Sequence, residues 1–285
     1  MRKLLSLFAL LCALLAVSAQ AFADADTPQT SKVADASQMT SVLDVVDDAM
    51  TPVFADALRD GVYEAAVDSS SSMFHIERCE LTVADGAITA ALTMSSTSYA
   101  YLYPGTAAQA AAADAGDYLP PDGSGRVFVF PVPALDAGVP CAAWSRNKEL
   151  WYDRTLVFRA DSLPLAAFRD VKTAATLELA DGVYSVEVAL AGGSGRAGVR
   201  SPCRLWVENG AATAEIVWSS TNYDYMRADG ARFDAEIVDG HSVCVIPVAA
   251  FDRPLSVVAD TTAMSRPHEI EYSLRFDAAT LTAQP

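Results

Sequence analysis

The sequence predicts an all-β protein made of two tandem immunoglobulin-like β-sandwich modules, which follow a signal peptide and a short helical segment. Three observations predict this fold: an internal repeat, one hairpin signal in each copy of the repeat, and short runs of strand-forming residues around it. Each copy spans about 100 residues, which is the usual size of such a sandwich.

The repeat consists of five motifs that occur in the same order in both halves, offset by ~120 residues. The matched pairs are Asp60–Tyr63 with Asp181–Tyr184, Cys79–Gly86 with Cys203–Gly210, Ser95–Tyr101 with Ser219–Tyr225, Phe130–Asp136 with Ile246–Asp252, and Ser145–Tyr152 with Ser265–Tyr272. Five ordered matches are not expected by chance, so we predict a first module at 58–160, a linker at 161–176 and a second module at 177–280.

Local signals within the repeat are those of β-hairpins. Asp85-Gly86 and Asn209-Gly210 each separate two runs of alternating apolar residues, and these dipeptides favour two-residue hairpin turns. Further strands are expected at 127–132, 152–158, 243–248 and 272–276. The Ala-rich stretch 106–116 predicts a short helix in a loop of the first module.

The N-terminus has the pattern of a secretory signal. Arg2 and Lys3 precede an apolar run, and small residues follow up to Ala23, so residues 1–23 are expected to be removed on export; an uncleaved anchor is the alternative. Residues 24–57 are a polar segment with apolar residues at helical spacing from 39 to 50, which predicts an amphipathic helix behind a Ser37 cap that ends at Pro52.

The charge balance excludes one class of partner. The chain has 20 Lys and Arg against 36 Asp and Glu, a net charge of −16, whereas nucleic-acid binding needs clustered cations. We therefore expect no nucleic-acid partner.

The cysteines favour disulfide bonds. Cys79, Cys141, Cys203 and Cys244 follow the predicted signal peptide, and an even number in an exported chain is typical of bridges. Their spacing predicts the pairs Cys79–Cys141 and Cys203–Cys244. A thiolate metal site is the alternative, although no Cys-x-x-Cys spacing supports it.

No motif of a nucleophile, a phosphate loop or a metalloprotease is present, so the protein is not predicted to be an enzyme. Ser69–His75 places Met73, Phe74 and His75 together, either as an exposed group or with the first two in the core. Tyr99 with Tyr101, and Tyr223 with Tyr225, are spaced to share a strand face, where they either line a flat ligand or cover the core.

The end of each module has a second candidate group. His268 and Tyr272 are four residues apart and share a face of an extended strand, with Met264 and Glu269 close by in the sequence. Imidazole binds transition metals, and phenolate suits ferric iron and haem. Lys148 and Tyr152 hold the equivalent positions in the first module. The alternative is that the Tyr packs across the sheet and the His is solvated.

The order of these motifs resembles that of NEAT (near iron transporter) modules, immunoglobulin-like sandwiches of bacterial surfaces that bind haem and pass it on. The resemblance rests on Gly-x-Tyr, Ser-Ser-Met-Phe, the Asp/Asn-Gly turn, Ser-Ser-x-x-Tyr and the four-spaced pair ending in Tyr. It implies that a lip near Met73, Phe74 and His75 covers the ligand, and that the four-spaced pair coordinates it. Here Lys148 and His268 replace the first Tyr of that pair.

We therefore predict a secreted or cell-surface protein that binds iron or haem in bacterial iron acquisition, with copper as a further possible metal. His268 is expected to be the ligand, and Tyr272 a second ligand or a supporting hydrogen-bond partner, assisted by Met264 and Glu269. A membrane iron transporter or another surface protein is the expected partner. The alternative is a structural or adhesive surface protein that contacts protein or glycan without metal.

Overall fold

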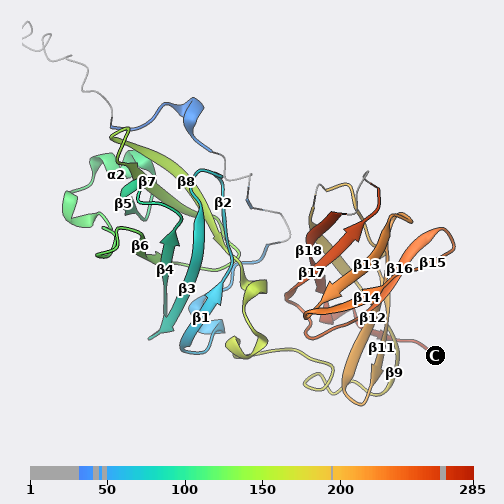
Figure 1. Ribbon diagram of the computed structural model, residues 1–285. Helices are drawn as coiled ribbons and strands as arrows, with labels where there is room; N and C mark the ends of the chain where they lie inside the picture. Colours follow the sequence, from blue (N-terminus) through green and yellow to red (C-terminus); the bar gives the residue numbers. More distant parts are fainter. Residues whose placement is uncertain (1–31, 41–44, 47–49, 194, 264–267) are drawn as a thin grey trace, which may run out of the picture.

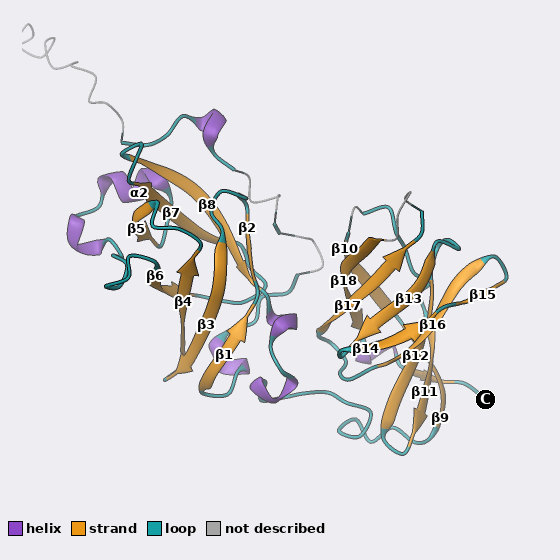
Figure 2. Cartoon of the chain, viewed as in Figure 1, coloured by secondary structure: helices purple, strands orange, loops and turns teal. Residues whose placement is uncertain are grey.

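The computed structural model describes residues 32–40, 45–46, 50–193, 195–263 and 268–285 (Figure 1). The predicted signal peptide, Met264 and most of the predicted helix at 39–50 lie outside these residues. Strands dominate the described chain and the few helices are short (Figure 2), so the all-β prediction is confirmed. No helix among the described residues is long and apolar enough to cross a membrane.

The first module has two antiparallel sheets that enclose one core. One sheet has the order β1 (Gly61–Ala65), β3 (Ile76–Ala84), β4 (Ala87–Met94), β6 (Val127–Val132). The other has the order β2 (Val67–Ser69), β8 (Leu150–Phe158), β7 (Val139–Ser145), β5 (Tyr99–Tyr103). Leu81 and Phe128 from one sheet and Leu156 from the other are fully buried between them.

The second module is built in the same way. One sheet has the order β15 (Glu236–Val238), β16 (His241–Pro247), β12 (Ala211–Val217), β11 (Cys203–Glu208), β9 (Gly182–Val186), β19 (Thr282–Ala283). The facing sheet has the order β10 (Val188–Gly192), β18 (His268–Phe276), β17 (Pro254–Thr261), β13 (Tyr223–Ala228), β14 (Ala231–Asp234). The strand orders β9-β11-β12-β16 and β10-β18-β17-β13 match those of the first module. The module limits themselves stay a prediction.

The hairpin turns follow from their residues. Asp85 and Gly86 have φ angles of 51° and 74°, and Asn209 and Gly210 have 53° and 77°. Positive φ at both central residues defines the type I′ turn, whose twist matches that of paired strands. β3 pairs with β4, and β11 with β12, across these turns as predicted.

The helices differ from the sequence prediction at one cap. The 3₁₀ helix η1 (Ala36–Gln38) begins after Asp35, whose carboxylate accepts hydrogen bonds from the Ser37 amide and hydroxyl at 2.8 and 2.7 Å. Asp35 therefore caps the turn, and the prediction of a Ser37 cap was wrong, because Ser37 already lies inside the turn. The predicted Ala-rich helix is confirmed as α2 (Ala107–Ala112), which starts with a capping box between Thr106 and Gln109.

The disulfide prediction was wrong, because all four cysteines are buried and free. Cys203 and Cys244 lie on β11 and β16, and β12 runs between those strands. Two strand spacings amount to ~9.6 Å, beyond the ~7 Å reach of a disulfide between Cα atoms. Cys79 and Cys141 lie on β3 and β7 of the two facing sheets, and both are free. Burial raises the pKa of the Cys79 thiol to about 12 and that of Cys203 to about 11.

Candidate functional site

The candidate ligand pair lies on β18, at the end of the second module. His268 is the first residue of the strand, is exposed and lies opposite Thr261 on β17. Tyr272 is four residues further along without a break in register, so both side chains belong to the inward face of the strand. Tyr272 is only 4 % exposed. The imidazole of His268 is therefore accessible to solvent, whereas the phenol of Tyr272 is buried in the core.

An aromatic cluster holds Tyr272 in place. Its hydroxyl lies 3.0 Å from the hydroxyl of Tyr223 on β13, and the Tyr223 ring stacks on Trp218 with ring centres 3.9 Å apart. The Trp218 and Tyr272 ring centres are 5.3 Å apart. Burial and the hydrogen bond with Tyr272 raise the pKa of Tyr223 well above its ordinary value. Because Tyr272 is buried and its hydroxyl is already bonded to Tyr223, it is placed to support a neighbouring group and not to reach an external ligand.

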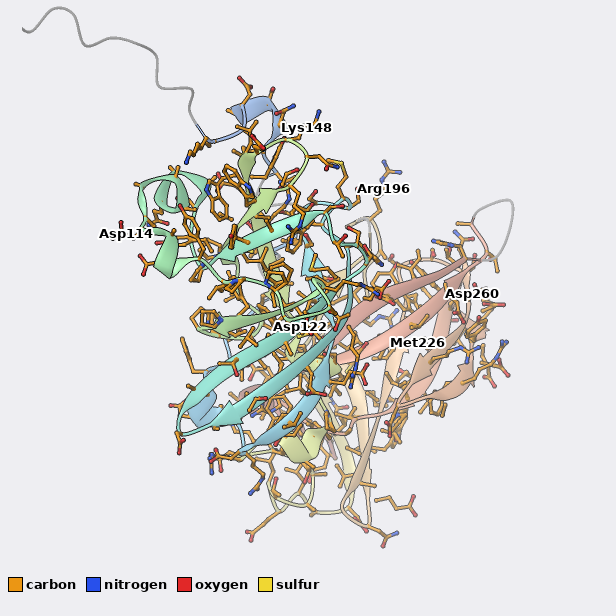
Figure 3. The ribbon with its side chains drawn as sticks, turned by 60° about the vertical axis from the view of Figure 1, so that its left-hand side comes forward. Asp114, Asp122, Lys148, Arg196, Met226 and Asp260 are labelled. Carbon is orange, nitrogen blue, oxygen red and sulfur yellow. The ribbon has the colours of Figure 1, made fainter. Side chains whose placement is uncertain are left out.

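A glycine-rich segment covers this cluster. Gly193 has a φ of 62°, and a Cβ atom there would lie 2.6 Å from the Tyr272 ring, so only glycine allows this approach. We call residues 193 and 195–199 the lip of the second module. The segment carries exposed Arg196, labelled in Figure 3, and exposed Arg200 directly follows it. Both offer charge to an anionic ligand.

Glu269 points away from His268. The Tyr225 hydroxyl and Arg227 Nε donate hydrogen bonds to Glu269 Oε1 at 2.7 and 3.0 Å on the outer face of the sheet. The bond from Tyr225 keeps the pKa of the Glu269 carboxyl below its ordinary value. Neighbouring residues of a strand face opposite sides, so Glu269 and His268 do not converge on one point.

The tyrosine pairs do not share a face, contrary to the sequence prediction. The register shifts between Tyr223 and Tyr225, and also between Tyr99 and Tyr101. Such a bulge breaks the alternation of side chains. Tyr223 therefore packs inward while the Tyr225 hydroxyl reaches Glu269 outside. The sequence has no Gly or Pro at these positions to signal a bulge.

The first module arranges its candidates differently. Lys148 is exposed in the turn between β7 and β8 (Figure 3), and Tyr152 is half-buried on β8. Phe74 is buried with its ring centre 5.0 Å from that of Tyr99, as the core alternative expected, while Met73 is 77 % exposed. His75 is exposed beside them. We call residues 71–75 the lip of the first module.

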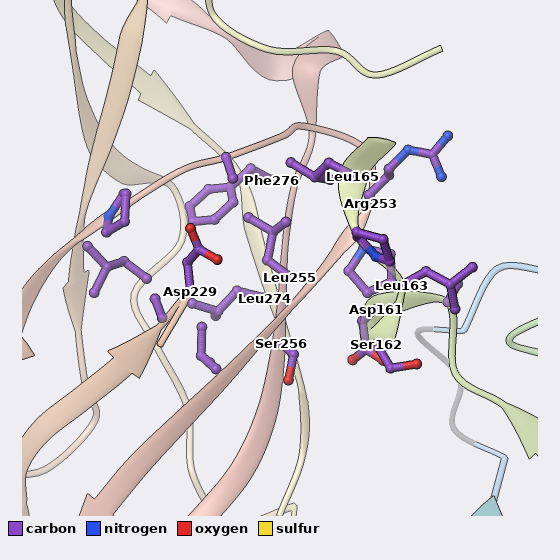
Figure 4. A pocket seen from close by; sticks show the side chains of 18 of the residues that line it. Asp161, Ser162, Leu163, Leu165, Asp229, Arg253, Leu255, Ser256, Leu274 and Phe276 are labelled. Atoms are coloured by element: carbon purple, nitrogen blue, oxygen red, sulfur yellow. The ribbon is translucent and has the colours of Figure 1, made fainter. Parts of the chain in front are cut away.

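A large cavity lies elsewhere (Figure 4). It has a volume of about 710 Å³ and lies between residues 160–168 and the ends of the strands of the second module, near Leu274 and Phe276. These residues are at the opposite end of β18 from His268. The Arg253 guanidinium at this cavity stacks 3.8 Å from the Phe168 ring centre. The sequence had no periodic signal for this cavity, because it forms between distant segments.

Free metal ions and haem make different demands on a site. Among the described residues, no group of three or more His, Cys, Asp or Glu side chains is placed to hold a metal ion. Haem iron receives its equatorial ligands from the porphyrin and takes only axial ligands from the protein. His268 can provide one axial ligand.

The comparisons with known proteins give only a distant likeness. No family model and no curated protein matches the chain. Two solved structures are similar to part of it: the NEAT5 domain of IsdX2, a B. anthracis hemophore, in complex with haem, and a point mutant of the same domain with haem. Each match has 18 % identity and a TM-score of 0.28, and covers 34 to 35 % of this chain and 97 % of the other. The function proposed below therefore rests on the side chains.

Proposed function

We propose that this protein binds haem at the end of its second module and acts in bacterial iron acquisition. The observation that carries the proposal is the exposed imidazole of His268 on the strand face that continues into the buried Tyr272. A neutral imidazole is a common axial ligand of haem iron. The bond between the Tyr272 and Tyr223 hydroxyls holds the buried end of this strand face in place.

The lip of the second module supports the same assignment. Gly193 lies directly on the Tyr272 ring, Arg196 is part of the lip, and Arg200 directly follows it. Guanidinium groups pair with carboxylates in a fork geometry, so these arginines suit the propionates of haem. Local positive charge is needed here, because the chain as a whole has a net charge of −16.

The cellular setting follows from the N-terminal pattern. A protein exported through the predicted signal peptide would meet haem or iron outside the cell membrane. It would then hand the ligand to a membrane iron transporter or to another surface protein. No catalytic step is part of this proposal.

The test is a titration of the full mature chain with haem, followed by its Soret absorbance. We expect a shifted Soret band in the unsubstituted protein and in His75→Ala, and loss of that band in His268→Ala. His75 is a matched control, because its imidazole is also exposed but lies in the first module. Retention of the band in His268→Ala, or absence of any band in the unsubstituted protein, would overturn the assignment.

A second candidate function has its own observation. Ile237 and Val238 on the edge strand β15 are 60 % and 47 % exposed, and Val245 on the adjacent β16 is 47 % exposed. An exposed apolar edge strand is a surface that other chains can pair with. An adhesive role predicts that Ile237→Lys abolishes attachment of the protein to its protein or glycan partner while His268→Ala has no effect.

A further inference from the structure

Arg154 is a buried cation in the first module, and no acidic side chain among the described residues is paired with it. It lies on β8, is 4 % exposed, and belongs to the inward face together with Tyr152 and Leu156. The equivalent position in the second module is Leu274. A charged side chain thus replaces an apolar one at the same place in the fold.

All contacts of Arg154 are with neutral groups. Its Nη1 donates to the Asp153 carbonyl oxygen at 2.6 Å, and its guanidinium carbon lies 5.2 Å from the Tyr152 ring centre. It also approaches the phenol of Tyr99, whose pKa burial raises and Arg154 lowers. Its Nε is buried without any hydrogen-bond partner. The Asp153 carboxylate is engaged on the other face, where it accepts a bond from the Ala107 amide.

Arg159 has the kind of acidic partners that Arg154 lacks among the described residues. Arg159, five residues further along the chain, is paired with Asp161 at 2.9 Å and with Asp68 at 3.3 Å. Among the ion pairs of the described residues, none includes Arg154. An unpaired cation in a protein interior is unfavourable, because burial removes its hydration without providing a counter-charge. An anion from outside the chain would remove this penalty.

Aromatic side chains connect Arg154 to the lip of the first module, through Tyr99, which contacts both the guanidinium and the lip. The Tyr99 hydroxyl donates to the Met73 carbonyl oxygen at 3.3 Å, and the Phe74 ring packs on Tyr99. Tyr152 is half-buried and Met73 is largely exposed. A ligand that displaced the lip would uncover the Tyr99 ring, and the Arg154 guanidinium lies next to that ring.

We propose that Arg154 is the anion-recognising residue of a separate binding site in the first module, which takes an aromatic carboxylate behind the lip. The planar guanidinium matches a carboxylate in a two-pronged hydrogen bond, with the partnerless Nε as one donor. The rings of Tyr152, Tyr99 and Phe74 suit an aromatic body. This site requires neither His268 nor a metal, so it goes beyond the function proposed for the second module.

The probe for this site is benzoate, with the uncharged benzamide as its match. We expect benzoate, and not benzamide, to move the Arg154 Nε–H resonance in nitrogen-15 spectra and to raise the thermal unfolding midpoint of the full chain. Arg154→Leu introduces the residue of the second module and should abolish the rise in the midpoint. Arg78→Leu removes an exposed arginine of the same module and should leave it unchanged.

Two further variants separate the possible outcomes. Arg154→Lys keeps the charge but not the fork, so its benzoate affinity should fall at least tenfold, whereas His268→Ala should bind benzoate like the unsubstituted chain. If Arg154→Leu does not fold, the response of the Arg154 Nε–H resonance to benzoate in the unsubstituted protein still tests the proposal. A resonance that saturating benzoate does not move, or an equal midpoint rise in Arg154→Leu, overturns the proposal.

Discussion

Replacing Asp136 by Asn should stabilise the protein at neutral pH, and the reason lies in a pair of equivalent aspartates. Asp136 and Asp252 follow β6 and β16, both with positive φ, of 48° and 59°. Each uses Oδ1 to accept the first amide of a 3₁₀ helix, from Ala160 or Ala278, at 2.8 Å. Their Oδ2 atoms differ. That of Asp252 lies 2.6 Å from Lys172 Nζ, and that of Asp136 is buried without a partner.

These surroundings move the two pKa values in opposite directions. Burial raises the pKa of Asp136 to about 6, although the hydrogen bond from the Ala160 amide acts in the opposite direction. The pKa of Asp252 is lowered, because its bonds with Lys172 and Ala278 outweigh its partial burial. A carboxyl with a raised pKa folds more favourably when protonated. Its penalty is therefore absent below pH 3.8, the ordinary value, and is fully present above pH 6.

The magnitude follows from the displacement of the Asp136 pKa. From 3.8 to about 6, at ~1.36 kcal/mol per pKa step, the penalty reaches ~3 kcal/mol above pH 6. Asp136 also lines a small cavity of about 20 Å³ with Arg275, roughly the size of one water molecule, which lowers the penalty. We expect Asp136→Asn to gain ~1–3 kcal/mol at pH 7.5. Asn keeps the acceptor for Ala160 and tolerates positive φ.

The assay is urea unfolding at pH 7.5 and pH 4.0, followed by tryptophan fluorescence. The gain for Asp136→Asn should be present at pH 7.5 and nearly absent at pH 4.0. Asp252→Asn is the matched control and should instead lose ~0.5–1 kcal/mol at pH 7.5, because it breaks a partly exposed ion pair. A loss of stability for Asp136→Asn at pH 7.5, or an equal gain at both pH values, would refute the reasoning.

Two other predictions concern the lip and the thiols. Gly193→Ala should lower the free energy of unfolding by ~1–2 kcal/mol and weaken haem binding, because the new Cβ meets the Tyr272 ring and the backbone φ is positive. Gly230→Ala is the control for the backbone effect alone, because Gly230 has a similar φ but open space around it. In the chain without residues 1–23, which include Cys12, the four buried cysteines should not react with a thiol reagent at pH 8 until urea unfolds the chain, after which four thiols should be counted. Rapid reaction of the folded protein, or fewer than four thiols on unfolding without reductant, would contradict the free-cysteine structure.

Much of the fold could be predicted because its signals are local. Asp85-Gly86 and Asn209-Gly210 place two hairpins through their own φ preferences, and the alternating runs around them give the strands that face the core. These features depend on residues close in the chain, so no knowledge of the tertiary structure is needed.

The candidate site could be predicted only in part. Strand alternation correctly places His268 and Tyr272 on one face of β18, but the same rule failed for Tyr223 and Tyr225, where a bulge turns one side chain outward. Cysteine spacing did not reveal that β12 separates Cys203 from Cys244. Bulges and strand order depend on pairing partners that are distant in sequence.

The sequence by itself determined that this chain forms strands with a repeated order, because turn chemistry and side-chain alternation act over a few residues. Only the tertiary structure decided which polar groups lost their water without gaining a partner. Arg154 and the second oxygen of Asp136 are ordinary charged groups in the sequence. Their burial between sheets and segments far apart in the chain makes one of them a candidate ligand site and the other a source of pH-dependent stability.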